Sequence, residues 1–223
     1  MALKALLSIS LFLFPWPIRR YVLKRAFGYQ IHPTARIGFS IILSDQLEMG
    51  AGAWIGNLTV CKGLAKLHMG EGSSIGNLNQ ITGFPADDLS YFGADSDRHP
   101  ELILACHAAV TERHVIDCTN RVRLGKFATL AGYRCQILTH SIDLYQSRQA
   151  SKPITIGEYC FVGTGSILLG GSTLPDCCVL GAGSLLNKVL TETHSLYAGV
   201  PARLIKHLPH DTGYFQRETG AVH

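Results

Sequence analysis

Aliphatic residues recur at every sixth position along much of this chain, in two long runs and two shorter groups. The first run is Ile31, Ile37, Leu43, Met49, Ile55, Cys61 and Leu67, and the second is Ile156, Val162, Leu168, Leu174, Leu180 and Leu186. The shorter groups are Leu104, Val110 and Ile116, and then Leu124 and Leu130. A period of six fits neither a helix, with about 3.6 residues per turn, nor an ordinary strand, with a period of about two. It predicts short strands that alternate with sharp turns.

Two other positions of the repeat are also restricted. Glycine often follows the aliphatic residue, as at Gly38, Gly50, Gly56, Gly125, Gly157, Gly163 and Gly181. A small residue stands four positions after it, as at Ala35, Ala53, Thr59, Ala128, Cys160, Ser166, Ser172, Cys178 and Ser184. Glycine permits the backbone angles of a tight turn, and a small residue fits a crowded corner. Three such sides close a triangular coil, so the pattern predicts an all-β parallel β-helix.

The repeat divides the chain into three parts. We expect an apolar and basic helical segment at 1–28, the β-helix at 29–190, and a C-terminal extension at 191–223. Two stretches interrupt the period, at 82–101 and at 139–153. Both are too polar for the core and are predicted to be surface loops, where functional residues concentrate. The first, with two prolines and four aspartates, is interpreted as a surface insertion that at most helps to shape an acceptor cleft.

Composition limits the function classes. The hydrophobic content of 47% in 223 residues is sufficient for one core. The net charge of +4 is small and no dense stripe of Lys and Arg occurs, so nucleic-acid binding is not supported. None of the seven cysteines forms a CxxC pair, and Cys61, Cys160 and Cys178 fall at repeat positions. They are interpreted as small buried side chains of a protein from a reducing compartment, the cytoplasm.

The N-terminal segment has two open interpretations. Its apolar run at 5–14 is far shorter than the ~20 residues that span a bilayer. Trp16 is followed by basic residues, a mixture expected of a segment that lies on a membrane surface. The basic residues are Arg19, Arg20, Lys24 and Arg25. Residues 1–25 are therefore predicted either to contact the inner face of a membrane or to plug one end of the core.

Residues 31–208 resemble the hexapeptide-repeat acyltransferases. The stretch ITIGEYCFVGTGSILLGGSTLPDCCVLGAGSLLNK at 154–188 and YAGVPARLIK at 197–206 are similar to the C-terminal half of sugar O-acetyltransferases. RHVIDC at 113–118 and LTHSID at 138–143 resemble a subgroup from colanic acid and other surface-polysaccharide pathways. The resemblance implies a left-handed β-helix, an exception to the usual right-handed crossover. It also implies transfer from acetyl-CoA to a sugar or polysaccharide hydroxyl, without a covalent enzyme intermediate and without a metal.

Histidine is suited to take a hydroxyl proton because its pKa lies near neutral pH. In the resembled enzymes the catalytic histidine stands just before the second loop, which corresponds to His140. A carboxylate would hold the other ring nitrogen, and two candidates stay open. Asp143 is nearest in sequence, and Asp117 belongs to the preceding coil, where Ile116 should stack on Ile137. His114 is expected on the same side, in contact with the acceptor.

The resemblance also implies a donor site. The pantetheine arm of acetyl-CoA would follow turns of the β-helix, bound by backbone groups at Gly163, Thr164, Gly181 and Ala182. Arg203 and Lys206 in the PARLIK stretch match the cations that bind the phosphates of the donor. In the resembled enzymes three chains pack side by side, so a homotrimer with active sites between subunits is expected.

Three alternatives remain at this point. A longer acyl donor acting on a lipid-linked sugar would fit the same motifs, and a β-helix that serves only as a scaffold would lack CoA binding. A zinc enzyme of the γ-carbonic anhydrase type is disfavoured, because no pair among the ten histidines has its H-x4-H spacing. A metal cluster of Cys106, His107, His114 and Cys118 matches no standard spacing.

Overall fold

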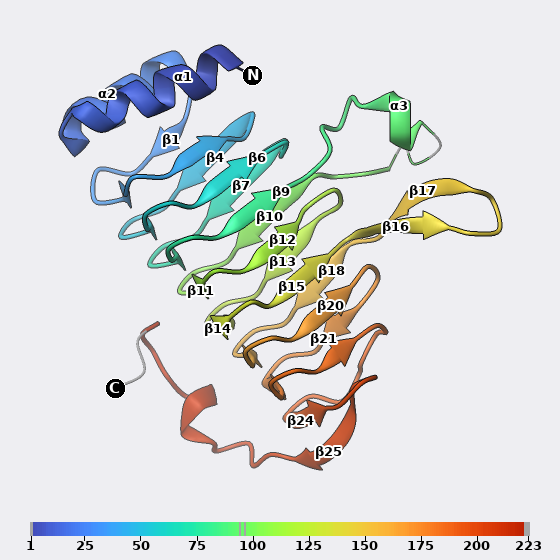
Figure 1. The fold of residues 1–223 in the computed structure, drawn as a ribbon. Helices are drawn as coiled ribbons and strands as arrows, with labels where there is room; N and C mark the ends of the chain where they lie inside the picture. The colour runs from blue at the N-terminus through green and yellow to red at the C-terminus, as the bar shows by residue number, and fades with distance from the viewer. Residues whose placement is uncertain (1, 94, 96, 221–223) are drawn as a thin grey trace.

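The computed structural model describes residues 2–93, 95 and 97–220, and the chain winds as a left-handed parallel β-helix (Figure 1). Each coil contributes one short strand to each of three sheets, which we name A, B and C in chain order. Sheet A contains β1 (Gln30–Ile31), β4 (Gln46–Met49), β7 (Lys66–Met69), β10 (Glu101–Leu104), β13 (Val122–Leu124), β18 (Ile154–Ile156) and β21 (Thr173–Leu174). The chain therefore turns at three edges, A–B, B–C and C–A.

Sheets B and C repeat this arrangement. Sheet B contains β2 (Arg36–Ile37), β5 (Trp54–Ile55), β8 (Ser74–Ile75), β11 (Ala109–Glu112), β14 (Thr129–Tyr133), β19 (Phe161–Val162), β22 (Cys178–Leu180), β24 (Ser195–Ala198) and β25 (Arg203–His207). Sheet C contains β3 (Ile41–Leu43), β6 (Val60–Lys62), β9 (Gln80–Thr82), β12 (Val115–Asp117), β15 (Gln136–Leu138), β20 (Ile167–Leu169) and β23 (Leu185–Leu186). All neighbours in the three sheets pair in parallel except β24 and β25, which are antiparallel.

The sixfold repeat forms the core. Successive coils align like residues, so that Ile137 of β15 lies between Ile116 of β12 and Leu168 of β20. All three side chains are buried, as are the small residues that the repeat places at the corners. Burial of one aliphatic side chain in each strand, together with the parallel hydrogen bonds between coils, holds the stack together.

The structure corrects one position of the predicted repeat. Ile42, and not Leu43, points into the core, because β3 aligns Ile42 with Cys61 of β6. The step from Ile37 to the next core residue is therefore five residues long. The turn between β2 and β3 is shortened by one residue, and the period resumes afterwards with Met49 and Ile55 in the core.

Both ends of the β-helix are covered by segments that leave the repeat. At the N-terminal end, α1 (Ala2–Ser10), the 3-10 turn η1 (Leu11–Leu13) and α2 (Trp16–Ala26) lie across the first coils (Figure 1). Leu11, Leu23 and Phe27 pack against the core from this cap. At the other end β25 turns back on β24, and the tail continues through η2 (Gly213–Phe215).

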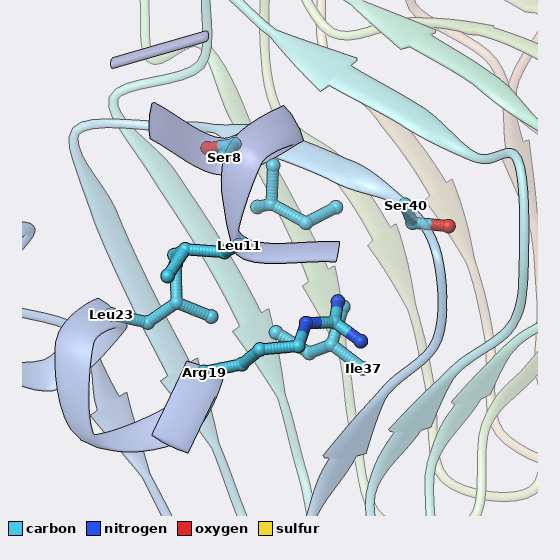
Figure 2. A pocket seen from close by; sticks show the side chains of 7 residues that line it. Ser8, Leu11, Arg19, Leu23, Ile37 and Ser40 are labelled. Carbon is cyan, nitrogen blue, oxygen red and sulfur yellow. The ribbon is translucent and has the colours of Figure 1, made fainter. Parts of the chain in front are cut away.

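Arg19 lies on the inner side of the cap (Figure 2). Its guanidinium donates a hydrogen bond of 2.6 Å to the carbonyl of Gly38 and lies against the rings of Phe12, Trp16 and Phe39. A cavity of about 10 Å³, the size of one water, remains beside it. Neither helix of the cap, nor any other in the described part of the chain, has the length and apolar character needed to cross a bilayer.

Candidate active site

Both insertions leave the β-helix at the C–A edge, on either side of one short corner (Figure 1). The first joins β9 to β10 and contains α3 (Leu89–Phe92). The second joins β15 to β18 and forms a hairpin of β16 (His140–Asp143) and β17 (Arg148–Ser151). Between them, residues 118–121 turn the chain from β12 to β13. These three connections stand on successive coils, so residues distant in sequence meet at this edge.

His140 and Asp117 form the central contact of the edge. The pairing of β12 with β15 places Asp117 beside Leu138, two residues before His140. His140 Nδ1 lies 2.8 Å from Asp117 Oδ2. An ionised carboxylate only accepts hydrogen bonds, so Nδ1 carries the proton and Nε2 keeps a free lone pair. This is the tautomer that a general base needs.

Asp117 is held by a set of hydrogen-bond donors. The backbone N–H groups of Thr119, Thr139 and His140, and the hydroxyls of the two threonines, donate to its oxygens at 2.6 to 3.1 Å. Burial by itself would raise the pKa of Asp117, but hydrogen bonds from His140, Thr119 and Thr139 outweigh burial and lower the pKa to about 2. The carboxylate is therefore ionised and fixed in orientation at neutral pH.

His140 combines a fixed orientation with access to solvent. Its hydrogen bond to Asp117 raises its pKa above the usual value, against the opposing effect of partial burial. The side chain keeps 35% of its surface exposed, so a substrate can approach the ring. The rings of Phe84 and Phe92 stand edge-on to the imidazole, with centroids at 5.7 and 6.2 Å. The first insertion thus forms an apolar wall beside His140.

Buried Arg98 holds that wall in place. Its guanidinium donates to the carbonyls of Phe84 and Pro85, both at 2.6 Å, and to that of Thr119 at 3.3 Å. It also lies 4.5 Å from the ring centroid of Phe92. One side chain therefore ties the first insertion to the corner that carries Asp117 and Thr119.

The two insertions are also joined directly. The backbone N–H and the hydroxyl of Ser151 donate to Asp95 Oδ2 at 3.0 and 2.6 Å, and the Asn120 amide donates to Ser151 Oγ at 3.0 Å. A cleft of about 380 Å³ opens beside this junction. Its polar lining consists of Asp95, Asp97, His99, Asn120, Arg121 and Ser151. Carboxylates, amides and hydroxyls of this kind can hydrogen-bond the hydroxyl groups of a sugar.

Asp143 and His114 lie away from the imidazole of His140. The Asp143 carboxylate accepts hydrogen bonds from the backbone N–H groups of Tyr145 and Gln146 and so shapes the hairpin turn. It is three residues beyond His140 in β16, and alternate strand residues face opposite ways. His114 precedes β12, at the end opposite Asp117, and is 1% exposed. Of the two candidate carboxylates, Asp117 is the one in contact with His140.

Hydrogen bonding explains why His114 is part of the interior. Its Nδ1 accepts from the backbone N–H of Cys135 at 3.1 Å, which leaves Nε2 as the donor to the Thr111 hydroxyl at 2.9 Å. Burial lowers the pKa of His114 to about 4, so the ring is neutral. This geometry fixes the backbone at the B–C edge.

Four of the six residues predicted to bind the donor lie in turns at the B–C edge. Gly163 and Thr164 follow β19, Gly181 and Ala182 follow β22, and the two turns stack on one another. Gly165 and Gly183 occupy the same edge with φ of 68° and 67°. Among the described residues, no heavy atom lies within 4 Å of where a Cβ would stand at these two glycines. The edge is therefore bare backbone at these two positions.

The coils before this bare stretch carry side chains at the same edge. Arg113 and Arg134 adopt left-handed backbone angles, with φ of 57° and 59°, at the turns that precede Gly165. A cavity of about 340 Å³ is lined by both arginines with Tyr133, Thr164 and Gly165. Further along, Arg203 and Lys206 are exposed on β25, opposite Ala198 and Leu196 of β24. Cations thus stand at both ends of the bare stretch.

Solved structures with the same architecture include two acyltransferases. One is a mutant of AntD, an N-acyltransferase from Bacillus cereus, in complex with dTDP-4-amino-4,6-dideoxyglucose and coenzyme A. It matches with a TM-score of 0.55 at 13% sequence identity, over 86% of this chain and 90% of that chain. The other is the polysialic acid O-acetyltransferase OatWY, with a TM-score of 0.54 at 17% identity, over 83% of this chain and 90% of that chain. The chain has the fold of these two enzymes. No protein-family model matches the sequence.

Several residues of the site were not predicted from the sequence. Thr119 and Thr139 orient Asp117, Phe84 and Phe92 form the wall beside His140, and Arg98 supports it. The threonines had a usable signal, because each stands at the C–A corner within two residues of the end of a strand that the repeat predicts. The wall had none, since the first insertion has no period that would fix its position.

The four residues considered as a metal cluster lie at three different edges, with Cys106 next to His107 at the A–B edge. His107 stacks on the ring of Phe127 at the A–B edge, with centroids 5.0 Å apart. Cys118 is buried at the C–A corner, and His114 is engaged as described above. Within the described residues, no three His, Cys, Asp or Glu side chains converge as metal ligands would.

Proposed function

We propose that this protein is an O-acetyltransferase that moves an acetyl group from acetyl-CoA to a hydroxyl of a sugar or polysaccharide. The observation that carries the proposal is the 2.8 Å contact between His140 Nδ1 and a carboxylate that is kept ionised. It leaves Nε2 free to act as a general base. The fold shared with two acyltransferases supports the same reaction class.

The reaction balances with His140 as the proton carrier. Nε2 takes the proton of the acceptor hydroxyl while the oxygen attacks the thioester carbonyl of acetyl-CoA. The carbon–sulfur bond then breaks, and the thiolate leaves with the proton returned from the imidazolium. The products are the acetyl ester and CoA with a free thiol. The charge on Asp117 stabilises the imidazolium between these two steps.

The bare backbone at the B–C edge supports a pantetheine site there. The N–H and C=O groups near Gly163, Thr164, Gly181 and Ala182 would bond the amides of the arm. Arg203 and Lys206 would bind the phosphates of the donor, because both are exposed cations beyond the end of the bare stretch.

The position of these sites supports the proposal of a homotrimer. His140 stands at the C–A edge and the proposed donor site at the B–C edge, so the full width of sheet C separates them within one chain. A thioester bound along the B–C edge would meet His140 of a neighbouring copy and not of its own. The complete site would then lie between subunits. Sedimentation of the protein as a stable monomer would contradict this assembly.

The acceptor is proposed to enter the cleft between the two insertions. The carboxylates of Asp95 and Asp97 and the amide of Asn120 supply acceptors and donors for sugar hydroxyls. The complex of AntD with a nucleotide sugar and coenzyme A supports an acceptor of the sugar class. A cytoplasmic location is proposed because acetyl-CoA is made there and because all seven cysteines are free thiols.

The test is release of free thiol from acetyl-CoA by the purified protein, offered nucleotide sugars and short glycans. Release should require an acceptor and should be lost in His140→Ala. His32→Ala is the matched control, because His32 is an exposed residue of the first coil, far along the chain from the C–A insertions. Binding of acetyl-CoA without any responding acceptor would direct the search to longer acyl donors. A protein that binds no CoA would be a scaffold, and the proposal would be wrong.

A further inference from the structure

The cap over the N-terminal end has an unusual charge. The first 44 residues contain no Asp or Glu, and their basic residues are Lys4, Arg19, Arg20, Lys24, Arg25 and Arg36. Arg19 is buried under the cap, while Lys4, Lys24, Arg25 and Arg36 are exposed. The outer side of this end is therefore positive only, although the whole chain has a net charge of just +4.

The same surface carries large apolar side chains. On α1 and η1 the exposed residues Leu6, Ile9 and Leu13 follow a spacing of three and four, which places them on one helix face. On α2, Ile18 and Tyr21 follow the same spacing beyond exposed Phe14. The opposite faces hold Leu11 and Leu23, which pack on the core. Both helices thus turn an apolar stripe outwards as well as inwards.

Basic and apolar groups alternate closely on α2. Lys24 and Arg25 continue the outward face one turn after Tyr21. A cleft of about 590 Å³ lies at this position, between α2 and the first coil. Its lining is Pro17, Arg20, Tyr21, Lys24, Arg25, Ile31 and Pro33. Cations around a partly apolar hollow suit a phosphate headgroup whose acyl chains lie beside it.

We propose that the cap formed by residues 2–27 docks onto an anionic phospholipid surface. The apolar residues Leu13, Phe14 and Ile18 enter the interfacial layer, and the basic residues meet lipid phosphates. A second copy of this chain is a poorer occupant, because symmetric packing would bring two acid-free positive faces together. The proposal does not depend on acyl transfer, since vesicle binding is measured without acetyl-CoA or an acceptor.

The experiment is flotation of the full-length protein with two kinds of vesicle, phosphatidylcholine alone and phosphatidylcholine mixed with phosphatidylglycerol. We expect the protein to float with the mixed vesicles only, and added salt to weaken the binding. Lys24→Gln with Arg25→Gln should lower the partition coefficient about 25-fold, at about fivefold for each basic residue. Arg123→Gln with Lys126→Gln is the matched control, because both side chains are exposed near the A–B turn away from the cap.

A second pair of variants tests the apolar part. Leu13→Gln should reduce binding to mixed vesicles, whereas Leu144→Gln should not, although the two leucines are 88% and 85% exposed. Neither change removes a buried side chain, so circular dichroism should show unaltered folding for both. Absence of binding to mixed vesicles, or binding that ignores both cap variants, would overturn the proposal. The proposal would also be wrong if light scattering without lipid showed a smaller particle for the cap variants than for the wild type. That result would mean that the cap is an interface between copies of this chain.

Discussion

Replacement of Asp117 by asparagine changes the candidate site at one atom. The side chain keeps its shape, but one carboxylate oxygen becomes an amide nitrogen, which donates where Asp117 accepts. His140 Nδ1 must then accept, so the proton moves to Nε2 and the ring can no longer take one from a hydroxyl. We expect kcat to fall by ~10³–10⁴-fold. KM for acetyl-CoA should change little, because the proposed donor site lies at a different edge.

The same variant has a calculable effect on stability. Lowering the pKa of Asp117 from 3.8 to about 2 on folding corresponds to about 2 kcal/mol. A lowered carboxyl pKa contributes stability above the unfolded value, and the contribution is lost as pH falls towards 2. Urea unfolding should therefore show the wild type losing about 2 kcal/mol more than Asp117→Asn between roughly pH 5 and pH 2. Asp45→Asn, which alters an exposed carboxylate, is the control.

The pH dependence of catalysis gives an independent measure of the contact. Because the hydrogen bond to Asp117 raises the pKa of His140, the base form is populated only above that raised value. The kcat/KM of the wild type should rise with pH through a midpoint above 6.5, and the residual activity of Asp117→Asn should rise at a lower pH. Wild-type turnover in Asp117→Asn, or an unchanged midpoint, would refute the role assigned to this carboxylate.

Four further substitutions have defined outcomes. Gly165→Ala and Gly28→Ala each place a methyl group on a residue with positive φ, 68° and 71° respectively. Each variant should therefore lose about 1 kcal/mol of stability in urea unfolding. Only Gly165→Ala should also raise KM for acetyl-CoA, and Gly28→Ala is its control. Arg98→Met leaves the carbonyls of Phe84 and Pro85 without their hydrogen-bond donor. We expect the free energy of unfolding to fall by about 1–3 kcal/mol and limited proteolysis to cleave residues 83–100 faster. Unchanged protection from the protease would contradict the role of Arg98. Leu168→Ala should cost about 2–5 kcal/mol in urea unfolding because its side chain is fully buried, and a loss below 1 kcal/mol would mean that the coil collapses around the gap.

The repeat could be read from the sequence because each coil imposes the same demand on its residues. Every coil needs one aliphatic side chain per strand and one small residue per corner. The period is therefore visible in the amino-acid sequence. The alignment of Ile116 with Ile137 follows from this period and is confirmed by the register of β12 and β15. That register brings Asp117 next to His140. Separation along the sequence could not by itself decide whether Asp117 or Asp143 contacts His140.

The insertions obey no such repeated demand. The sequence of 82–101 does not predict that Phe84 and Phe92 pack beside His140. Their position depends on the hydrogen bonds from Arg98 to backbone carbonyls of the insertion. His114 was misplaced for a related reason. The two ends of a three-residue strand lie at different edges, and His114 directly precedes β12 whereas Asp117 is its last residue. Proximity in sequence therefore did not mean a shared edge.

The number of stacked coils sets the distance between the cap and His140. Along sheet C, β15 stands four strands from β3, the first strand under the cap, and a spacing of about 4.8 Å per strand separates the two by about 19 Å. If the cap rests on lipid, His140 is held at a fixed height above the bilayer. A hydroxyl at the lipid headgroup would be out of reach, while one on a glycan that projects from the membrane would be presented to the base. Adding or removing one coil below β12 would change this reach by one strand spacing and leave the chemistry intact.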